Sequence, residues 1–419
     1  MRVLFLSTND TLGGAAIAAI RLFRSVASTS GVTAQMLVQS KSGCDPLVIK
    51  PESDISKLLS LVRLPFETLL VRRVYRRAQT ANFMPSRLPD GLRSRIDAFS
   101  PDVLHVHWVG HSFLRPETLS QVSCPIVWTL HDMWALTGGC YYDGGCGKYT
   151  TECGECPVLG STRRIDLSTR VMRRKRSAWR DLDLTIVSPS RWLASCAASS
   201  SLHSSRRIEV IPYGLSPEIF QPWPKSEARR MLGLPNGVNL VLFGAAGLSD
   251  PRKGFSYLQA ALSKLLPSRL NLELVVFGGQ LPPASIQELG VKVHSLGRLG
   301  DELTAALAYS AADLFVAPSL EDNLPNTVLE ASMCGTPVVA FRVGGIPDIV
   351  EHKVTGILVE PRSSEDLARA IQSLIEDPDT RARFATSART KSVQEFAHDL
   401  QATRYLSLYS QLLKPAAAA

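Results

Sequence analysis

The stretch DLFVAPSLEDNLPNTVLEASMCGTPVVAF, residues 313–341, contains two short apolar runs separated by a segment of helical character. Apolar runs joined through a helix are typical of parallel strands that are covered on both faces. Pro325 stands where a helix tolerates proline in its first turn, and Gly335 stands where a helix ends. Asp322 or Asn323 is placed to cap this helix. The stretch therefore predicts a strand, a polar loop, a helix and a second strand.

The same alternation continues in both directions along the chain. The apolar runs are VLFL, AQMLV, DVLHVHW, PIVWTL, LTIVSPS and RIEVIPY in the first half, and NLVLFGA, LELVVFGG, VKVHSL, DLFVAPS, PVVAF and GILVEP in the second. The series restarts after Tyr213, where GLSPEIFQPWPKSEA is rich in proline and turn residues. We predict an α/β protein of two doubly wound, Rossmann-like domains that face each other across a cleft and bind ligands beyond the carboxyl ends of their strands.

This restart sets the predicted domain boundaries. Residues 1–213 would form the first domain and residues 214–395 the second. The helical segment 396–414 carries no further strand and could pack back on either domain, of which we expect the N-terminal one. Residues 415–419, PAAAA, have the composition of a disordered tail.

The length and charge of the chain limit its function classes. A chain of 419 residues suits two domains of about 200 residues each. No apolar run reaches the roughly 18 to 20 residues of a membrane span, and MRVLFLS is too short for a signal peptide, so we predict a cytoplasmic protein. The net charge of +8 suits an anionic partner, such as phosphate groups or an acidic membrane surface. Neither zinc-finger spacing nor an RNA-binding aromatic pattern is present, so we expect no nucleic-acid partner.

Residues that could bind an anionic ligand follow several of the predicted strands. Gly13 and Gly14 follow the first strand and would let the backbone approach a ligand, although paired glycines are also common in plain strand–helix turns. Arg252 and Lys253 stand just before a helix in the second domain, where cations and backbone donors together can hold a diphosphate. The alternative for this pair is a solvated loop.

Two further candidates carry titratable side chains. His131 follows the run PIVWTL and could donate a proton or a hydrogen bond to a substrate hydroxyl. The alternative is a histidine satisfied in the core, which fits His105 and His107 better. Glu330 lies on a helix buried between strands and therefore needs partners, which the vicinal hydroxyls of a sugar ring could supply.

Taken together, these motifs resemble the GT-B glycosyltransferases, specifically the retaining family 4 type. The similarity rests on the order and spacing of GG after the first strand, TLHD, VSPSRW, VIPYG, PRKG, FGG, the SLED…LEA…CGTPVV run, GGIPDIVE and GILVEP. The sequence departs from the family pattern at Asp322, where the family has glutamate, and at Gly247, where a basic residue is common.

The resemblance implies a role for each matching residue. Glu330 would bind the ribose of a nucleotide donor, Asp322 would lie beside the transferred sugar, and Lys253 would hold the diphosphate, with Gly14 approaching from the other domain. His131 would contact the donor sugar near the reacting carbon. The implied catalytic residues are His131, Lys253 and Asp322. The implied donor-binding residues are Gly13, Gly14, Arg252, Lys253, Asn323, Leu324, Pro325, Asn326 and Glu330.

The implied activity is that of a retaining glycosyltransferase of the hexosyltransferase type. It would move a sugar from a nucleotide-diphosphate sugar to a hydroxyl of a saccharide or lipid-linked glycan, in assembly of a cell-surface polysaccharide, with the first domain on the acceptor side. The family needs no metal for catalysis. Two alternatives stay open: a nucleotide-sugar epimerase or hydrolase on the same fold, and a glycosyltransferase-like scaffold without activity.

Four cysteines gather in a glycine-rich loop over residues 138–160. Cys140, Cys146, Cys153 and Cys156 have the spacing C-x5-C-x6-C-x2-C. In a cytosolic chain, such clustered thiols favour a structural zinc site over disulfides, and an iron–sulfur cluster is a second option. The alternatives are four free thiols or two disulfides formed during handling.

A basic amphipathic segment, residues 56–79, suggests a second surface. Leucines and aromatic residues lead into Arg72, Arg73, Arg76 and Arg77, which share one side at helical spacing. Such a segment can lie in a membrane interface against anionic headgroups, here at the inner face of the cell membrane. The alternative is an ordinary domain helix, because Pro65 interrupts the pattern.

Overall fold

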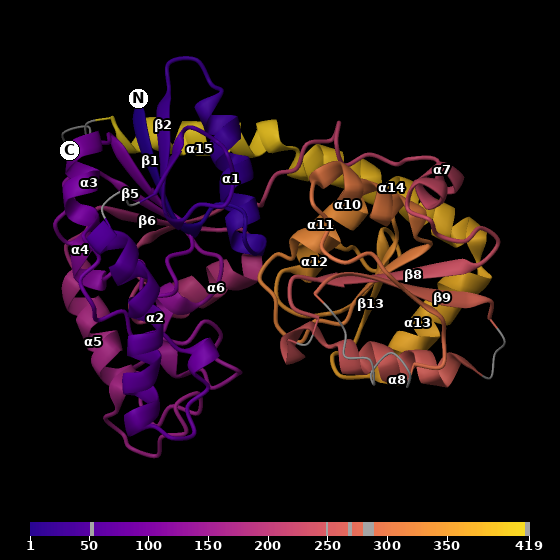
Figure 1. The fold of residues 1–419 in the computed structure, drawn as a ribbon, viewed down its shortest axis with the longest axis horizontal. Coiled ribbons are helices and arrows are strands. Elements are labelled where there is room, and N and C mark those ends of the chain that lie inside the picture. The colour runs from indigo at the N-terminus through magenta and orange to yellow at the C-terminus, as the bar shows by residue number, and fades with distance from the viewer. Residues whose placement is uncertain (51–53, 249, 267–269, 280–288, 415–419) are drawn as a thin grey trace. The chain divides into compact units, whose positions relative to one another are not determined.

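The structure, a computed structural model, describes residues 1–50, 54–248, 250–266, 270–279 and 289–414 (Figure 1). The chain divides into two compact units. Unit 1 comprises Met1–Pro212 and Ala402–Ala419, and unit 2 comprises Tyr213–Gln401. The predicted tail 415–419 lies outside the described residues. Among the described helices, none has the length and apolar character to cross a bilayer.

Unit 1 is built on a parallel sheet of seven strands in the order β3-β2-β1-β4-β5-β6-β7. The strand order reverses between β1 and β4, which is the switch point at which doubly wound sheets bind ligands. The strands are β1 (Arg2–Asn9), β2 (Thr33–Ser40), β3 (Val48–Ile49), β4 (Val103–Val106), β5 (Ile126–Thr129), β6 (Leu184–Ser188) and β7 (Arg207–Val210). The helices are α1 (Gly14–Ala27), α2 (Asp54–Val74), α3 (Leu92–Phe99), α4 (Pro116–Leu119), α5 (Leu167–Trp179) and α6 (Arg191–Ser199), with 3₁₀ turns η1 (Thr80–Asn82), η2 (Trp134–Leu136) and η3 (Lys148–Thr150).

Both faces of this sheet are buried, because alternate residues of each strand point to opposite sides. Leu4 and Leu6 of β1 pack with residues of α3, α4, α5 and α6, whereas Val3 and Phe5 pack with residues of α1 and α15. Helix α15 (His398–Leu412) is the last element of the chain (Figure 1). Its residues from Ala402 onward belong to unit 1, so the end of the chain completes the core of the first unit.

Unit 2 is built on a parallel sheet of six strands in the order β10-β9-β8-β11-β12-β13, which reverses between β8 and β11. The strands are β8 (Asn239–Ala245), β9 (Leu272–Gly278), β10 (Val293–Ser295), β11 (Leu314–Ala317), β12 (Val338–Phe341) and β13 (Gly356–Val359). The helices are α7 (Lys225–Met231), α8 (Phe255–Leu265), α10 (Glu302–Ala311), α11 (Asn326–Met333), α12 (Ile346–Ile349), α13 (Ser364–Glu376) and α14 (Pro378–Phe396), with the 3₁₀ turn η4 (Pro251–Lys253). The predicted fold class of two doubly wound α/β halves is confirmed.

The start of helix α11 differs from the sequence prediction. Neither Asp322 nor Asn323 caps it: the N-cap is Pro325, which makes no side-chain cap hydrogen bond, and the helix begins at Asn326. Proline suits this position because its fixed φ leads into a helix and it has no N–H to satisfy. Asp322 instead pairs with Lys253. The helix ends as predicted before Gly335, whose φ of +69° is in the left-handed region.

Candidate active site

Lys253 and Asp322 meet at the switch point of unit 2. Lys253 lies in the loop after β8 and Asp322 in the loop after β11, and these two strands are neighbours in the sheet. A backbone hydrogen bond from Leu320 N to Arg252 O, 2.7 Å long, joins the two loops. Lys253 Nζ lies 2.5 Å from Asp322 Oδ2. The structure thus brings together two predicted catalytic residues, 69 positions apart in sequence.

Two glycines allow these loops to pack so closely. Gly254, with a φ of +69°, lies so near the loop after β11 that a Cβ would be 1.8 Å from Pro318 O. At Gly344 a Cβ would be 1.7 Å from Asp322 O. Side chains at these positions would force the backbone apart, so the Lys-Gly pair of the PRKG motif serves the geometry of the Lys253–Asp322 contact.

Arg252 is held by a carboxylate of its own loop. Its Nη2 lies 2.7 Å from Asp250 Oδ2, and its backbone N–H donates to Asp250 Oδ1. Asp250 is the N-cap of η4, so one aspartate fixes both the turn and the guanidinium. The direction of Arg252, which the sequence could not predict, is therefore toward Asp250 in this structure.

Glu330 is buried in helix α11 and has a protein partner. The hydroxyl of Tyr309, in α10, donates a hydrogen bond of 2.8 Å to Glu330 Oε2. The carboxylate for which the sequence predicts a sugar partner is thus satisfied in part by the protein itself. Asn323, Leu324 and Pro325, which precede the helix, are also buried.

In unit 1 the predicted glycine pair opens helix α1. Gly13 is the N-cap, with a φ of +89° that disfavours any other residue. No heavy atom lies within 4 Å of the position where its Cβ would stand, so the exposed backbone here is open to close approach. Gly14 is the first residue of the helix. The open backbone at Gly13 fits the predicted donor-binding role of the glycine pair after β1.

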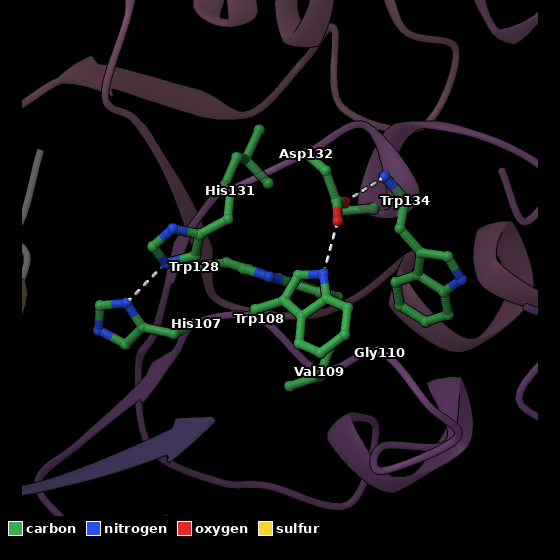
Figure 2. A pocket seen from close by; sticks show the side chains of 10 residues that line it. His107, Trp108, Val109, Gly110, Trp128, His131, Asp132 and Trp134 are labelled. Atoms are coloured by element: carbon green, nitrogen blue, oxygen red, sulfur yellow. Dashed lines mark hydrogen bonds between the residues drawn. The ribbon is translucent and has the colours of Figure 1, made fainter. Parts of the chain in front are cut away.

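His131 follows strand β5 and is bonded to a second histidine. Its Nε2 lies 3.0 Å from Nδ1 of His107, which follows the neighbouring strand β4 (Figure 2). Burial lowers the pKa of His131 to about 3, so the imidazole is neutral at neutral pH. His107 is buried, as its position in an apolar run predicts, but the sequence pattern alone did not indicate its contact with His131. The H-x-H pattern on a strand beside the one that carries His131 is the signal that could have revealed it.

Asp132 organises the turn that follows His131. It accepts hydrogen bonds from Trp108 Nε1, 2.6 Å away, and from the backbone N–H of Trp134, 2.8 Å away (Figure 2). These side chains surround a cavity of about 10 Å³. A cavity of this size holds about one water molecule, so it is not a sugar pocket. Trp108 and Asp132 instead hold the backbone that presents His131.

The cysteine-rich loop does not form a metal cage in this structure. Cys140, Cys153 and Cys156 are buried and Cys146 is exposed, and all four are free thiols. In the described part of the chain no group of three or more His, Cys, Asp or Glu side chains is arranged to hold a metal ion. Burial raises the pKa of Cys153 to about 11, so the thiol form predominates at neutral pH. Zinc binding would require the four sulfur atoms to come into a metal-binding arrangement that they do not have in this structure.

A buried lysine fastens this loop to unit 1. Lys175 of α5 donates hydrogen bonds from Nζ to the carbonyl oxygens of Trp134 and Thr137. Its Nζ also lies 3.5 Å from the ring centroid of Trp134, a cation–π geometry. Burial lowers the pKa of Lys175 to about 7. Lys175 of α5 thereby holds the backbone of the segment between His131 and the cysteines.

Two doubly wound parallel sheets, each with polar residues at the carboxyl ends of its strands, define the GT-B class of fold. Solved structures share it along nearly the whole chain. Alr3699/HepE of Anabaena, solved in complex with UDP-glucose, covers 98% of this chain and 100% of its own, with a TM-score of 0.67 and 20% identity. WaaG, a glycosyltransferase involved in lipopolysaccharide biosynthesis, covers 97% of this chain and 99% of its own, with a TM-score of 0.66 and 17% identity.

Sequence comparison adds the enzyme class. Residues 238–377, within unit 2, match the family described as glycosyl transferases group 1. The D-inositol 3-phosphate glycosyltransferase of Segniliparus rotundus is 26% identical over 410 residues, which are 96% of this chain and 85% of that protein. The chain is thus a glycosyltransferase with the GT-B fold, and the region that matches the group 1 family contains Lys253, Asp322 and Glu330.

Proposed function

We propose that this glycosyltransferase moves a hexose from a nucleoside-diphosphate sugar to an acceptor hydroxyl with retention at the anomeric carbon. The observation that carries the proposal is the Lys253–Asp322 contact of 2.5 Å at the switch point of unit 2. An ammonium at the end of β8 and the helix α11 after β11 both favour an anionic group there. A diphosphate would compete with Asp322 for Lys253, which frees the carboxylate to meet the hydroxyls of the sugar.

We propose that Glu330 binds the ribose of the donor and that His131 contacts its sugar. A carboxylate that already accepts one hydrogen bond from Tyr309 retains acceptor capacity for ribose hydroxyls. His131, neutral because burial lowers its pKa, can donate a hydrogen bond without adding charge beside the sugar. The UDP-glucose complex of Alr3699/HepE supports a donor of this class. No cofactor is proposed for the chemistry, which needs only stabilisation of the leaving diphosphate.

The reaction can be separated from its alternatives by a direct assay. Nucleotide sugars are incubated with and without a lipid-linked saccharide, and nucleotide release and the product anomer are followed by NMR. Transfer predicts nucleotide release that depends on the acceptor, with the donor's anomeric configuration kept in the product. Release of free sugar without acceptor would indicate a hydrolase, interconversion of the sugar would indicate an epimerase, and no reaction with any pair would favour a scaffold. Asp322→Asn should lower turnover more than nucleotide affinity.

The acceptor is proposed to be a saccharide or lipid-linked glycan of a cell-surface polysaccharide, reached at the inner face of the membrane. The described part of α2 supports a membrane contact. Val62, Phe66 and Leu69 are 44%, 46% and 62% exposed and recur at helical spacing, while Glu67 on the opposite side is buried. An exposed apolar stripe followed by arginines fits an interfacial helix.

The arginines are placed differently from the sequence prediction. Helix α2 continues through Pro65 and ends at Val74, so Arg76 and Arg77 lie beyond it and do not share its face. Arg72 donates from Nε to Thr80 Oγ1, 3.2 Å away. Arg73 is thus the arginine best placed to accompany the apolar stripe.

Vesicle sedimentation tests the membrane contact. We expect wild type to sediment with anionic vesicles at low salt, and Phe66→Ser with Leu69→Ser to abolish this. Met231→Ser, at a residue of unit 2 that is 55% exposed, is the matched control and should have no effect. Equal loss in the control, or no sedimentation of wild type, would exclude α2 as the membrane contact.

A further inference from the structure

The hydrogen bond between His107 and His131 restricts where each ring carries its proton. His107 Nδ1 and His131 Nε2 are 3.0 Å apart, so one nitrogen must donate and the other accept (Figure 2). Burial lowers the pKa of both rings, to about 3 for His131, so each is neutral with a single proton. Only two arrangements remain. Either His107 donates from Nδ1, or His131 donates from Nε2.

The surroundings of His107 distinguish these arrangements. Its other nitrogen, Nε2, is buried and has no hydrogen-bond partner among the described residues. If His131 donated, His107 would carry its proton on this Nε2, leaving a buried N–H unpaired. A buried N–H without a partner is rarer and more costly than a buried lone pair without one. The favoured arrangement therefore has the proton of His107 on Nδ1.

The ring of His107 is held in its plane by its neighbours. It stacks on Phe5, with the planes 13° apart, and its centroid lies 4.1 Å from that of His105. His105 is itself fixed: its Nδ1 lies 2.6 Å from the hydroxyl of Tyr409, and its Nε2 lies 2.8 Å from Thr129 Oγ1. Phe5 of β1 thus contacts His107 directly, and β5 and the C-terminal helix α15 support it through His105.

We propose that His107 is a positioning residue that holds His131 as the Nδ1–H tautomer. The ring nitrogen that carries the proton of His131 is then the one turned away from His107, and it is the hydrogen-bond donor that His131 can offer. The role of this N–H toward the sugar rests on the proposed function, because the contact of His131 with the donor belongs to that proposal. The tautomer itself does not depend on any ligand.

Long-range proton–nitrogen NMR correlations on the full chain with labelled histidine test the tautomer directly. His131→Gln assigns the signals. We expect the wild-type His131 to show a protonated Nδ1 and a bare Nε2 at neutral pH. His107→Asp offers only acceptor oxygens in the place of Nδ1, so it should switch His131 to the Nε2–H form. His107→Asn can donate from that place and should keep the wild-type form. An Nε2–H signal in wild type, or no switch in His107→Asp, would overturn the proposal.

Kinetics of the same variants separate this proposal from the proposed function. In His107→Asp, kcat should fall at least about tenfold, the effect of one lost hydrogen bond. Nucleotide affinity, which the proposed function assigns to Glu330 and Lys253, should be kept. His107→Asn should recover part of kcat relative to His107→Asp, which a merely structural role would not produce. If a variant does not fold, the wild-type spectrum still tests the tautomer proposal, because it shows which nitrogen of His131 carries the proton. An Nδ1–H signal in a protein that transfers no sugar would count against the proposed function alone.

Discussion

A carboxylate buried inside a helix must be held by donors, and at Glu330 one donor is the hydroxyl of Tyr309. This contact changes how the residue should be tested. Truncation to alanine would remove any ligand contact and also this acceptor of the Tyr309 hydroxyl. A loss of activity could then not be separated from a loss of stability. Glutamine keeps an acceptor oxygen for Tyr309 and removes only the charge.

We therefore predict that Glu330→Gln binds nucleotide about 10 to 100 times more weakly, because two hydrogen bonds to a charged acceptor become bonds to a neutral one. The free energy of unfolding should change little. Isothermal titration calorimetry and denaturant unfolding measure the two effects. The control is Tyr309→Phe, which should lower stability by about 1 kcal/mol while nucleotide still binds. Unchanged affinity in Glu330→Gln would remove Glu330 from the donor site.

Single residues were predictable to different degrees. Lys253 and Asp322 are predictable because they follow strands, and parallel topology brings the loops after neighbouring strands together. The partner of Glu330 was not predictable, because Tyr309 lies in another helix and nothing in the spacing indicates the contact. His107 was missed because a histidine inside an apolar run resembles a core residue. Its contact with His131 depends on the register of β4 against β5, in which Val106 pairs with Trp128.

At the scale of elements, α15 is tied to the sheet of unit 1 by two buried tyrosines. The hydroxyl of Tyr405 lies 2.7 Å from Thr129 Oγ1, and that of Tyr409 lies 2.6 Å from His105 Nδ1. The terminal helix thus reaches the strands that carry His107 and His131. A helical pattern in the sequence predicts that such a helix exists, but the side chains it meets come from the tertiary structure.

We predict that Tyr409→Phe lowers the stability of unit 1 by about 1–3 kcal/mol, because it leaves His105 Nδ1 buried without a partner. Urea unfolding monitored by tryptophan fluorescence measures the change. Tyr257→Phe, in α8 of unit 2, is the control and should leave unit 1 unaffected. Equal stability of Tyr409→Phe and wild type would mean that the hydroxyl contributes nothing to holding the helix.

The cysteine-rich loop remains the element whose chemistry is open to a simple test. A structural zinc site stays a prediction, because in this structure the described cysteines of the loop are not arranged to hold a metal ion. If zinc is bound, elemental analysis of protein purified without chelator will give about one metal per chain, and Cys146→Ser will lower that content. Iron with sulfide would indicate a cluster instead. Substoichiometric metal, together with titration of four reactive thiols in this loop, would contradict both.

At the scale of the whole molecule, buried neutral histidines predict how acid acts on stability. Burial lowers the pKa of His105, His107, His131 and His203, all of unit 1. In the unfolded chain each would titrate near pH 6.5, so below that pH the unfolded state binds more protons than the folded state. Acid therefore favours unfolding.

We expect the free energy of unfolding of unit 1 to fall as pH drops from 6.5 to 5, by up to about 1.4 kcal/mol per pH unit for each such histidine. Denaturant unfolding at a series of pH values measures the slope. His203→Gln should reduce the proton uptake by one. Stability that is independent of pH in this window would show that these histidines are already charged in the folded protein.

The overall architecture was accessible from sequence because continuous apolar runs and a proline-rich restart depend only on local composition. The fold class, the two series of strands and the polar strand ends follow from that pattern. The cap of α11 and the course of α2 through Pro65 differ from expectation, because packing against neighbouring elements decides them. The exposure of Cys146 could not be predicted for the same reason. The proposed function depends above all on a nucleotide sugar that binds at the strand ends of unit 2.

The most direct test is a thermal-shift and calorimetric screen of nucleoside diphosphates and their sugars on wild type, Lys253→Met and Lys264→Met. Lys264 pairs with Glu365 on the surface of unit 2 and serves as the control for loss of one lysine charge. We predict that at least one nucleotide sugar binds wild type and, at one hundred times its dissociation constant, adds about 2.7 kcal/mol of stability. Lys253→Met should abolish this effect and Lys264→Met should keep it. No stabilisation by any nucleotide, or the same stabilisation in Lys253→Met, would contradict the account.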